Sequence, residues 1–240
     1  MGTRTSSHIV RNFGMRNALQ ADHLTVKLTG SAGQSLGAFA APGLKIEVSG
    51  DANDYVGKGL SGGTVVVRPP MASPLTAADN TIIGNTVLYG ATDGYLFAAG
   101  RAGERFAVRN SGAKVVIEGC GACGCEYMTG GIAVILGDIG ANFGAGMTGG
   151  MAYLYDPEGK AEGVMNLETL VTTPVAVQHW EDQLKGLIER HVAETGSAKA
   201  RDILQHWDVE KANFLQVCPK EMLVHIPQPL TQEGTAVPAE

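Results

Sequence analysis

The chain of 240 residues has few charged side chains, few aromatic residues and no long apolar run. Asp, Glu, Lys and Arg together make up 18% of it, its net charge is −6, and it contains no run of basic residues. Such a chain offers no patch that would attract nucleic acid or anionic lipid. No apolar stretch reaches the roughly 18 residues that a transmembrane helix requires. We therefore expect a globular protein that binds neither nucleic acid nor a membrane.

Signals for export and for disulfide formation are also missing. The first residues, MGTRTSSHIVRNFGM, are polar and lack the apolar core of a signal peptide. Cys120, Cys123 and Cys125 are close together in the sequence, and Cys218 lies far along the chain. This spacing suits a reducing compartment better than a disulfide framework. We expect a cytoplasmic location.

Glycine, in contrast, is abundant, with 33 residues, and part of it recurs at a nearly fixed interval. Each recurring glycine precedes a short apolar run such as LKIEV, AKVVIEG or IAVILG, and one longer interval holds the insertion PPMASPLTAADN. A period near 20 residues with one strand per repeat is typical of a solenoid, here of about six to seven coils. Glycine permits positive φ and close backbone contact, so we expect these residues at the corners. The six corner glycines are Gly43, Gly63, Gly94, Gly112, Gly131 and Gly150.

Alignment on these glycines predicts which strand residues face the interior of the solenoid. The third residue after each glycine is apolar or aromatic, and this column is expected to point inward: Ile46, Val66, Phe97, Val115, Val134 and Tyr153. The second and fourth columns, expected to point outward, are also largely apolar and include Val65, Val67, Leu96, Val116, Ile135 and Leu154. An outer face of this kind predicts a covering layer, formed by C-terminal helices, another domain or both.

Residues 176–218 contain almost no glycine and are expected to be helical. The first helix, about 178–194, would place Trp180, Leu184, Leu187, Ile188 and Val192 on one stripe and end at Gly196. A second helix, about 197–207, would be capped by Ser197, and a third short helix would cover 208–217 and end before Pro219. We expect 226–240 to form a loose tail. The chain is thus divided into a solenoid domain with its N-terminal lead-in, 1–175, and a helical extension and tail, 176–240.

Three GxGxxG matches, at 57–62, 119–124 and 144–149, resemble a dinucleotide fingerprint. That motif needs a strand before it and a helix after it, whereas each match here precedes another strand-like run, so corners are expected instead. Cys120-x-x-Cys123-x-Cys125 resembles half of a metal site, but no second Cys or His cluster accompanies it. Small buried residues in tight corners are the expected alternative.

Histidine is absent from residues 24–178. A hexapeptide-repeat acyltransferase normally needs a catalytic histidine on its coils and an aliphatic residue every six positions, so that class is disfavoured. His179, His191 and His206 are expected at a surface or an interface. A pectate-lyase-like enzyme would need clustered carboxylates, and the spacing of Asp51, Asp54, Glu104, Glu126 and Asp138 does not by itself bring them together. The sequence therefore predicts no catalytic, cofactor-binding or metal-binding residue.

Several long strings of the sequence resemble the C-terminal domain of the glutamate synthase large subunit. They are GTRTSSHIV near the start, GSAGQSLGAF, GDANDYVGKGLSGG, IIGNTVLYGATDG, AGERFAVRNSGA, GCEYMTGG, NFGAGMTGGMAYLYD and VCPKEML. The resemblance covers most of the chain. It implies a single-stranded right-handed β-helix with GXGXG repeats, followed by a short helical segment.

In that family the parent enzyme converts glutamine and 2-oxoglutarate to glutamate, using FMN and iron–sulfur clusters, and so serves ammonia assimilation. The resemblance implies that the present chain is a non-catalytic structural domain without cofactors of its own. Its expected partners are the amidotransferase, central and FMN-binding domains, in cis or as separate chains. The alternative is a free-standing subunit of a related oxidoreductase complex, of the methylamine–glutamate synthase or formylmethanofuran dehydrogenase type. The two interpretations differ on whether Met1 begins a fragment of a larger polypeptide or a complete subunit.

Overall fold

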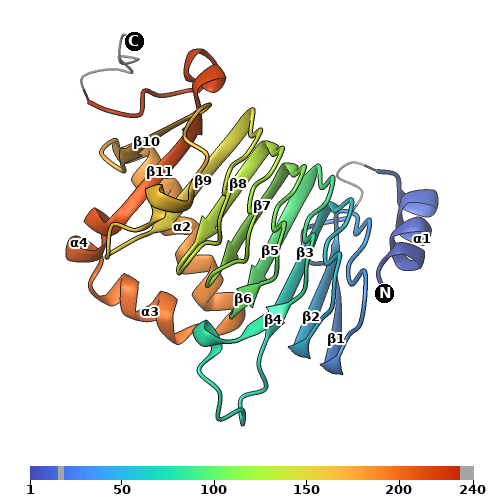
Figure 1. Ribbon diagram of the computed structural model, residues 1–240. Helices are drawn as coiled ribbons and strands as arrows, with labels where there is room; N and C mark the ends of the chain where they lie inside the picture. Colours follow the sequence, from blue (N-terminus) through green and yellow to red (C-terminus); the bar gives the residue numbers. More distant parts are fainter. Residues whose placement is uncertain (16–18, 233–240) are drawn as a thin grey trace.

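The structure is a β-solenoid of about seven turns, followed by a few helices (Figure 1). It is a computed structural model that describes residues 1–15 and 19–232. Each coil contributes one strand to a long sheet, and neighbouring coils pair in parallel in the order β1-β2-β3-β5-β7-β8-β9. The strands are β1 (Leu24–Ser31), β2 (Leu44–Asp51), β3 (Ser61–Arg68), β5 (Asp93–Ala98), β7 (Ser111–Ile117), β8 (Thr129–Ile135) and β9 (Gly149–Tyr155).

Shorter elements complete the described chain. β4 (Thr81–Ile83) and β6 (Arg101–Ala102) form a second small sheet at one corner of the coils. β11 (Phe214–Pro219) and β10 (Leu170–Pro174) extend the main sheet beyond β9 as antiparallel strands. The helices are α1 (Thr3–Phe13), α2 (Gln178–Thr195), α3 (Ala198–Gln205) and α4 (Trp207–Glu210), with short 3₁₀ turns at Ala77–Asp79, Ala161–Val164, Lys211–Asn213 and Lys220–Val224.

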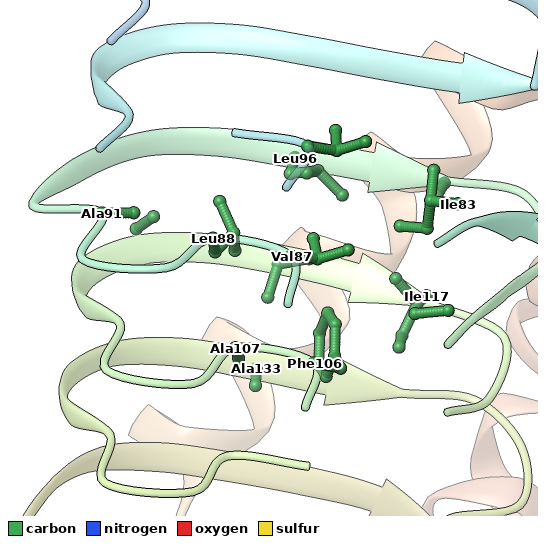
Figure 2. Packing of buried hydrophobic residues seen from close by; sticks show 14 of the residues in the cluster. Ile83, Val87, Leu88, Ala91, Leu96, Phe106, Ala107, Ile117 and Ala133 are labelled. Atoms are coloured by element: carbon green, nitrogen blue, oxygen red, sulfur yellow. The ribbon is translucent and has the colours of Figure 1, made fainter. Parts of the chain in front are cut away.

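The interior of the solenoid is filled by side chains that stack from coil to coil (Figure 2). The strand pairings align one inward column through the coils: Ile46, Val65, Leu96, Val115, Ala133 and Ala152. Across the interior these residues meet side chains from the turn segments, among them Val87, Leu88 and Phe106. Each member of the column is fully buried, as expected for a core at crystal-like packing density.

The predicted inward column is correct at Ile46 and Val115 and wrong at four other positions. Val66, Phe97, Val134 and Tyr153 point out of the solenoid and belong to a second apolar cluster, shared with α2. Their predicted outward neighbours Val65, Val67, Leu96, Ile135 and Leu154 point inward instead, and only Val116 faces outward as expected.

The error has a physical cause at the start of the strands. The strand pairings align Lys45, Thr64, Tyr95, Lys114, Ile132 and Met151 in one row. Gly63, Gly94, Gly131 and Gly150 directly precede this row, whereas Gly43 and Gly112 precede it by two residues. A constant count from the recurring glycine therefore reaches opposite faces of the strand in the two groups. The glycines thus recur at a nearly constant interval, but the face to which a given position after the glycine points differs between coils.

The expected covering layer is confirmed, and it is mainly α2. This helix contacts β3, β5, β7 and β8 on the outer face of the sheet. Trp180, Leu184, Leu187 and Ile188 are buried there, as the helical stripe predicted, and Gly196 ends the helix in the left-handed region. Figure 1 shows α2 behind the sheet and crossing the run of strands.

α2 runs along the stack of coils and touches strands at both of its ends. Near its start the hydroxyl of Tyr153 on β9 donates a hydrogen bond to Gln183, at 2.9 Å. Near its end Lys45 on β2 forms a 2.5 Å ion pair with Glu194. The 18 residues of α2 span about 27 Å at 1.5 Å per residue. The five strand spacings from β2 to β9 span about 24 Å. The helix is therefore long enough to contact most of the strands in the stack.

In the C-terminal segment the predicted second helix and its N-cap Ser197 are confirmed, and the predicted third helix is not. α3 begins after Ser197, whose Oγ accepts a 3.0 Å hydrogen bond from the amide of Ala200, as the N-cap prediction required. The third helix predicted over 208–217 is wrong, because only α4 and a 3₁₀ turn are helical. Phe214–Pro219 is strand β11 instead, buried between β9 and β10 in the main sheet. Burial of all residues but Leu215 and pairing with β9 and β10 outweigh the weak helical preference of this segment.

The predicted loose tail makes defined contacts in the part of it that the structure describes. Leu230 is buried, and the carbonyl of Pro229 accepts a 2.9 Å hydrogen bond from the indole of Trp180. The remainder of the predicted tail, 233–240, lies outside the described residues.

The N-terminal lead-in contains α1, which the sequence analysis did not predict. Ile9 and Ser6 are its buried residues, and the Ser6 hydroxyl accepts a 3.1 Å hydrogen bond from the amide of Ala41. α1 thereby lies against the turn of the first coils. None of the helices in 1–15 and 19–232 combines the length and the apolar character that a membrane crossing requires.

Candidate functional site

The feature that distinguishes these coils is a turn segment with three left-handed residues at alternate positions. In the first coil Ser35, Gly37 and Phe39 have φ of 56°, 67° and 56°. The same i, i+2, i+4 pattern of positive φ recurs in five further coils: at Tyr55, Gly57 and Gly59; Thr86, Leu88 and Gly90; Arg105, Ala107 and Arg109; Cys123, Cys125 and Tyr127; Asn142, Gly144 and Gly146. Most of these residues are not glycine, although left-handed backbone costs other residues about 1–2 kcal/mol each.

Backbone hydrogen bonds between coils hold these turn segments in place. The first left-handed residue donates to the following coil, as Arg105 does to the carbonyl of Ala122 at 2.8 Å. The second donates to the preceding coil, as Cys125 does to Phe106 at 2.7 Å. The third again donates to the following coil, as Tyr127 does to Ala145 at 2.9 Å. The alternation satisfies the backbone polar groups on a face that lacks regular β-pairing and offsets the cost of the conformation.

The six predicted corner glycines lie elsewhere on the coils, at the beginning of the strands. Gly43 directly precedes β2, and the other five lie within the first residues of β3, β5, β7, β8 and β9. Gly43, Gly94, Gly131 and Gly150 have positive φ. Gly63 and Gly112 do not, but a Cβ on Gly112 would come within 1.9 Å of the carbonyl oxygen of Thr92 on the neighbouring coil. Close backbone contact, rather than dihedral freedom, thus characterises Gly63 and Gly112.

The three GxGxxG matches lie in these coil turns. Gly57 and Gly59 belong to one turn segment with left-handed residues, and Gly144 and Gly146 belong to another. The next regular element after each match is a strand, β3, β8 or β9. A dinucleotide site would require a helix N-terminus at that point, so this geometry does not form one.

The clustered cysteines do not converge on a common point. Cys120 and Cys125 are buried in the apolar interior. Cys123 is half-buried, and its Sγ lies 3.7 Å from the side-chain Nδ2 of Asn142. Burial raises the pKa of Cys120 to about 12, and burial also raises the pKa of Cys125 well above its usual value. Two thiols with raised pKa in the apolar interior and a third outside it do not fit an iron–sulfur or zinc site. Cys120 and Cys125 match the expectation of small buried residues in tight corners.

The carboxylates that a pectate-lyase-like site would require lie at separate positions on the coils. Glu126 forms a 3.0 Å ion pair with Arg105, and Asp138 lies 3.9 Å from Arg101. Asp54 Oδ1 accepts a 2.8 Å hydrogen bond from the amide of Asn85. Within 1–15 and 19–232, no group of three or more His, Cys, Asp or Glu side chains could hold a metal ion.

A buried polar cluster under α2 was missed by the sequence analysis. Glu118 follows β7, and its Oε1 accepts a short hydrogen bond from the hydroxyl of Ser197 and lies 3.7 Å from Nε2 of His191. All three side chains are at most 3% exposed. His191 therefore lies at an internal interface, the second of the two positions expected for it, whereas His179 and His206 are exposed. The signal available in the sequence was a lone Glu directly after an apolar strand.

Ser, His and Glu also form catalytic triads, but their arrangement here differs from one. In a triad the imidazole accepts the hydroxyl proton, whereas Ser197 donates to the carboxylate of Glu118 and caps α3. Neither imidazole nitrogen of His191 has a hydrogen-bond partner among the described residues. A cluster closed to solvent cannot bind a substrate, so it joins α2 and α3 to the coils.

A surface cavity of about 330 Å³ lies where the last coils meet the helical segment. Its lining includes Asp138, Tyr155, Asp156, Lys160 and Lys199. Lys160 is paired with Glu158, and Asp156 accepts hydrogen bonds from the backbone of the following turn. The charged groups of this cavity are thus engaged in local structure.

A comparison with known protein families identifies the family of this chain. The family model described as "GXGXG motif" matches residues 1–220. The chain belongs to the GXGXG family. In this GXGXG chain the left-handed residues have an i, i+2, i+4 spacing, and glycine occupies only some of these positions.

Curated relatives of the GXGXG chain bear the name glutamate synthase. The "Glutamate synthase [NADPH] large chain" of Azospirillum brasilense is 62% identical over 239 residues, which are 97% of this chain and 16% of the relative. The "Ferredoxin-dependent glutamate synthase" of Pyropia yezoensis is 50% identical over 219 residues, 91% of this chain and 14% of the relative. The large chain of Bacillus subtilis is 48% identical over 220 residues, again 91% and 14%. The GXGXG chain thus spans about one sixth or less of the length of these relatives.

Proposed function

We propose that residues 1–240 act as a non-catalytic structural domain of a glutamate synthase. In this role they hold an amidotransferase and an FMN-binding synthase domain in register, while glutamine and 2-oxoglutarate are converted to glutamate. The observation that carries the proposal is the 62% identity over 97% of the chain to one part of a glutamate synthase large chain. Similar matches to NADPH-dependent and ferredoxin-dependent relatives support a role that does not depend on the reductant.

The described residues support a structural role by their arrangement. Turn segments and the helix α2 are engaged in holding the coils together, and the polar cluster of Glu118, His191 and Ser197 is closed to solvent. FMN and the iron–sulfur clusters of the enzyme would then lie in other domains, because the cysteines of this chain do not form a ligand set. We further propose a division into the solenoid domain 1–175 and the extension 176–240, with β11 of the extension docked on β9 of the solenoid. The proposed location is the cytoplasm.

Replacement of the matching region in the Azospirillum large chain by residues 1–240 tests this proposal. The chimera should form glutamate from glutamine and 2-oxoglutarate at a rate close to that of the natural enzyme. The matched control is the same large chain with the region deleted, which should lose that activity. Failure of the chimera despite a folded GXGXG region, or glutamate formation by residues 1–240 alone, would contradict the proposal.

A further inference from the structure

The turn segments form a face that carries most of the exposed aromatic side chains of the described chain. Phe39 and Tyr127 are 51% and 50% exposed, and Tyr55 and Tyr89 are 37% and 36% exposed. All four lie in the segments with left-handed residues, and Arg109 lies in the same position of its segment as Phe39 and Tyr127. We call Phe39, Tyr55, Tyr89, Arg109 and Tyr127 the aromatic face.

The left-handed backbone explains why these side chains point outward. With alternate residues at positive φ, the second left-handed residue of each segment is buried in the core, as Leu88 and Ala107 are. The first and third residues, among them Tyr55, Phe39, Arg109 and Tyr127, are then directed away from the core, whereas Tyr89 lies between the second and third residues of its segment. α2 lies on the outer side of the sheet, across the solenoid interior from the turn segments, and leaves the aromatic face uncovered.

Neighbouring coils fix the orientation of the rings. A Cβ on Gly59 would lie 2.4 Å from the ring of Phe39, and one on Gly146 would lie 2.5 Å from the ring of Tyr127. Each of these two rings thus packs directly against a glycine of the next coil. A ring held in this way loses little conformational entropy when a partner covers it, which lowers the cost of association.

Cations accompany the rings. The guanidinium of Arg109 lies 5.8 Å from the ring centroid of Tyr127, and Nζ of Lys58 lies 5.4 Å from that of Tyr55. Neither cation forms an ion pair within the described part of the chain, whereas Arg105 beside them is paired with Glu126. Ordered Tyr and Phe rings flanked by Arg match the residues that dominate binding energy at protein interfaces.

We propose that the aromatic face is the surface on which another domain of the same glutamate synthase polypeptide docks. This inference rests on the proposed function. The Azospirillum relative is 16% matched, so 84% of it (100 − 16) lies outside the matched region and must pack somewhere. The partner surface is a flat apolar patch with carboxylates that meet Arg109 and Lys58. A second copy of this chain is the competing occupant.

Site-specific photocrosslinking in the full chimeric large chain tests the proposal. The changes Tyr127→p-benzoylphenylalanine and Tyr55→p-benzoylphenylalanine should give crosslinks within one polypeptide to peptides from outside residues 1–240. Phe13 on α1, 55% exposed, is the matched aromatic control, and the same change there should give markedly fewer such crosslinks. The substitution Arg109→Glu should reduce the Tyr55 crosslinks to the level of Phe13, whereas Arg201→Glu on α3 should leave them unchanged.

Three results would overturn the proposal. They are crosslinks that join two copies of the chain, crosslinks as frequent from Phe13 as from Tyr127, and no crosslinks from the aromatic face. Glutamate formation by the same chimera is measured separately. An active chimera without these crosslinks refutes only the docking face, and an inactive chimera that is folded refutes the proposed function.

Discussion

Left-handed backbone at residues other than glycine is the most costly feature of the coils at the scale of single residues. Tyr55, Arg105 and Asn142 occupy it as regularly as Gly57 or Gly144. A hydrogen bond contributes about 1 kcal/mol net, similar to the conformational cost, so the inter-coil bonds roughly balance it. The repeat is therefore specified by backbone hydrogen bonding between neighbours, and glycine is required only where a Cβ would collide.

Gly112→Ala tests that distinction. Gly112 does not have positive φ, so alanine is compatible with its backbone, but the new Cβ would lie 1.9 Å from the Thr92 carbonyl oxygen. We expect the free energy of unfolding to fall by about 3 kcal/mol, as for overpacked cores. The measurement is thermal or urea unfolding.

Gly186→Ala is the matched control for this change. Gly186 lies within α2, and a Cβ there would meet no atom within 4 Å. Alanine should stabilise the helix by about 0.5–1 kcal/mol. Equal effects at both glycines would show that contacts between coils do not limit substitution.

The sequence revealed the period of the coils but not the residues that define the turn segments. Gly112 and Gly131 were visible because glycine is chemically distinct at a regular interval. The left-handed column was hidden because its members include Tyr55, Leu88 and Cys123, residues that rarely adopt this conformation. Only the hydrogen bonds between neighbouring coils make it favourable, and a single sequence does not display them.

At the scale of elements, α2 and α3 were predictable, whereas α1, the end of the third predicted helix and the orientation of the strands were not. The stripe of α2 and the N-cap Ser197 follow from local rules of 3.6-residue periodicity and capping. Strand orientation depends on where each recurring glycine lies in the pairing register, and a difference of one residue inverts inside and outside without a distinct residue pattern. β11 was missed for a related reason, because its pairing partners lie far away in the sequence.

A double-mutant cycle between Tyr153 and Gln183 tests the corrected orientation of β9. The Tyr153 hydroxyl donates a 2.9 Å hydrogen bond to Gln183 on α2, which requires the side chain to face out of the solenoid. Tyr153→Phe should lower the free energy of unfolding by about 1 kcal/mol. In the Gln183→Ala background the same change should cost much less, and additive effects would contradict the outward orientation.

The contact of α2 with α4 should weaken in acid. Burial alone would raise the pKa of Glu181, but hydrogen bonds from Trp207 and Lys211, at 3.0 Å each, outweigh it and lower that pKa below its usual value near 4.5. A carboxylate with a lowered folded-state pKa stabilises the protein above its unfolded-state value, and this stability is lost as the pH falls through the folded-state pKa.

Glu181→Gln should therefore reduce stability at pH 7, and the difference from the natural protein should shrink as the pH falls below about 4.5. The exposed residue Glu189 on the same helix is the control, since Glu189→Gln should give a small difference that stays constant. Melting temperatures across pH 3–7 provide the measurement. A pH-independent deficit in the Glu181 variant would rule out this ionic contribution.

At the scale of the whole molecule, α2 links coils that would otherwise contact only their neighbours. Repeat proteins commonly unfold in parts because each repeat interacts only with the next. Here the Arg190 guanidinium lies 3.8 Å from the ring centroid of Tyr95 on β5, and Glu194 is paired with Lys45 on β2. Tyr153 contacts the same helix from β9, so distant coils share one element.

Removal of the contacts at one end of α2 should uncouple the first coils. In the double variant Arg190→Ala with Glu194→Ala, we expect amide hydrogens of β1 and β2 to exchange faster while those of β8 and β9 stay unchanged. The control Glu189→Ala with Arg201→Ala changes exposed residues of the same helical segment and should leave exchange unaffected. Faster exchange along all strands would mean that the coils unfold as one unit without the helix.

The length of α2 matches the width of the sheet from β2 to β9, so the helix limits the number of coils that it can cover. Adding one coil lengthens the stack by about 4.8 Å. At 1.5 Å per residue, the helix would need about three more residues to reach the new end. Duplication of a coil whose outer face is apolar, such as that of β8, would leave this face uncovered beside the helix terminus. Addition of such a coil therefore requires two coordinated insertions, one in the coils and one in a helix encoded far downstream.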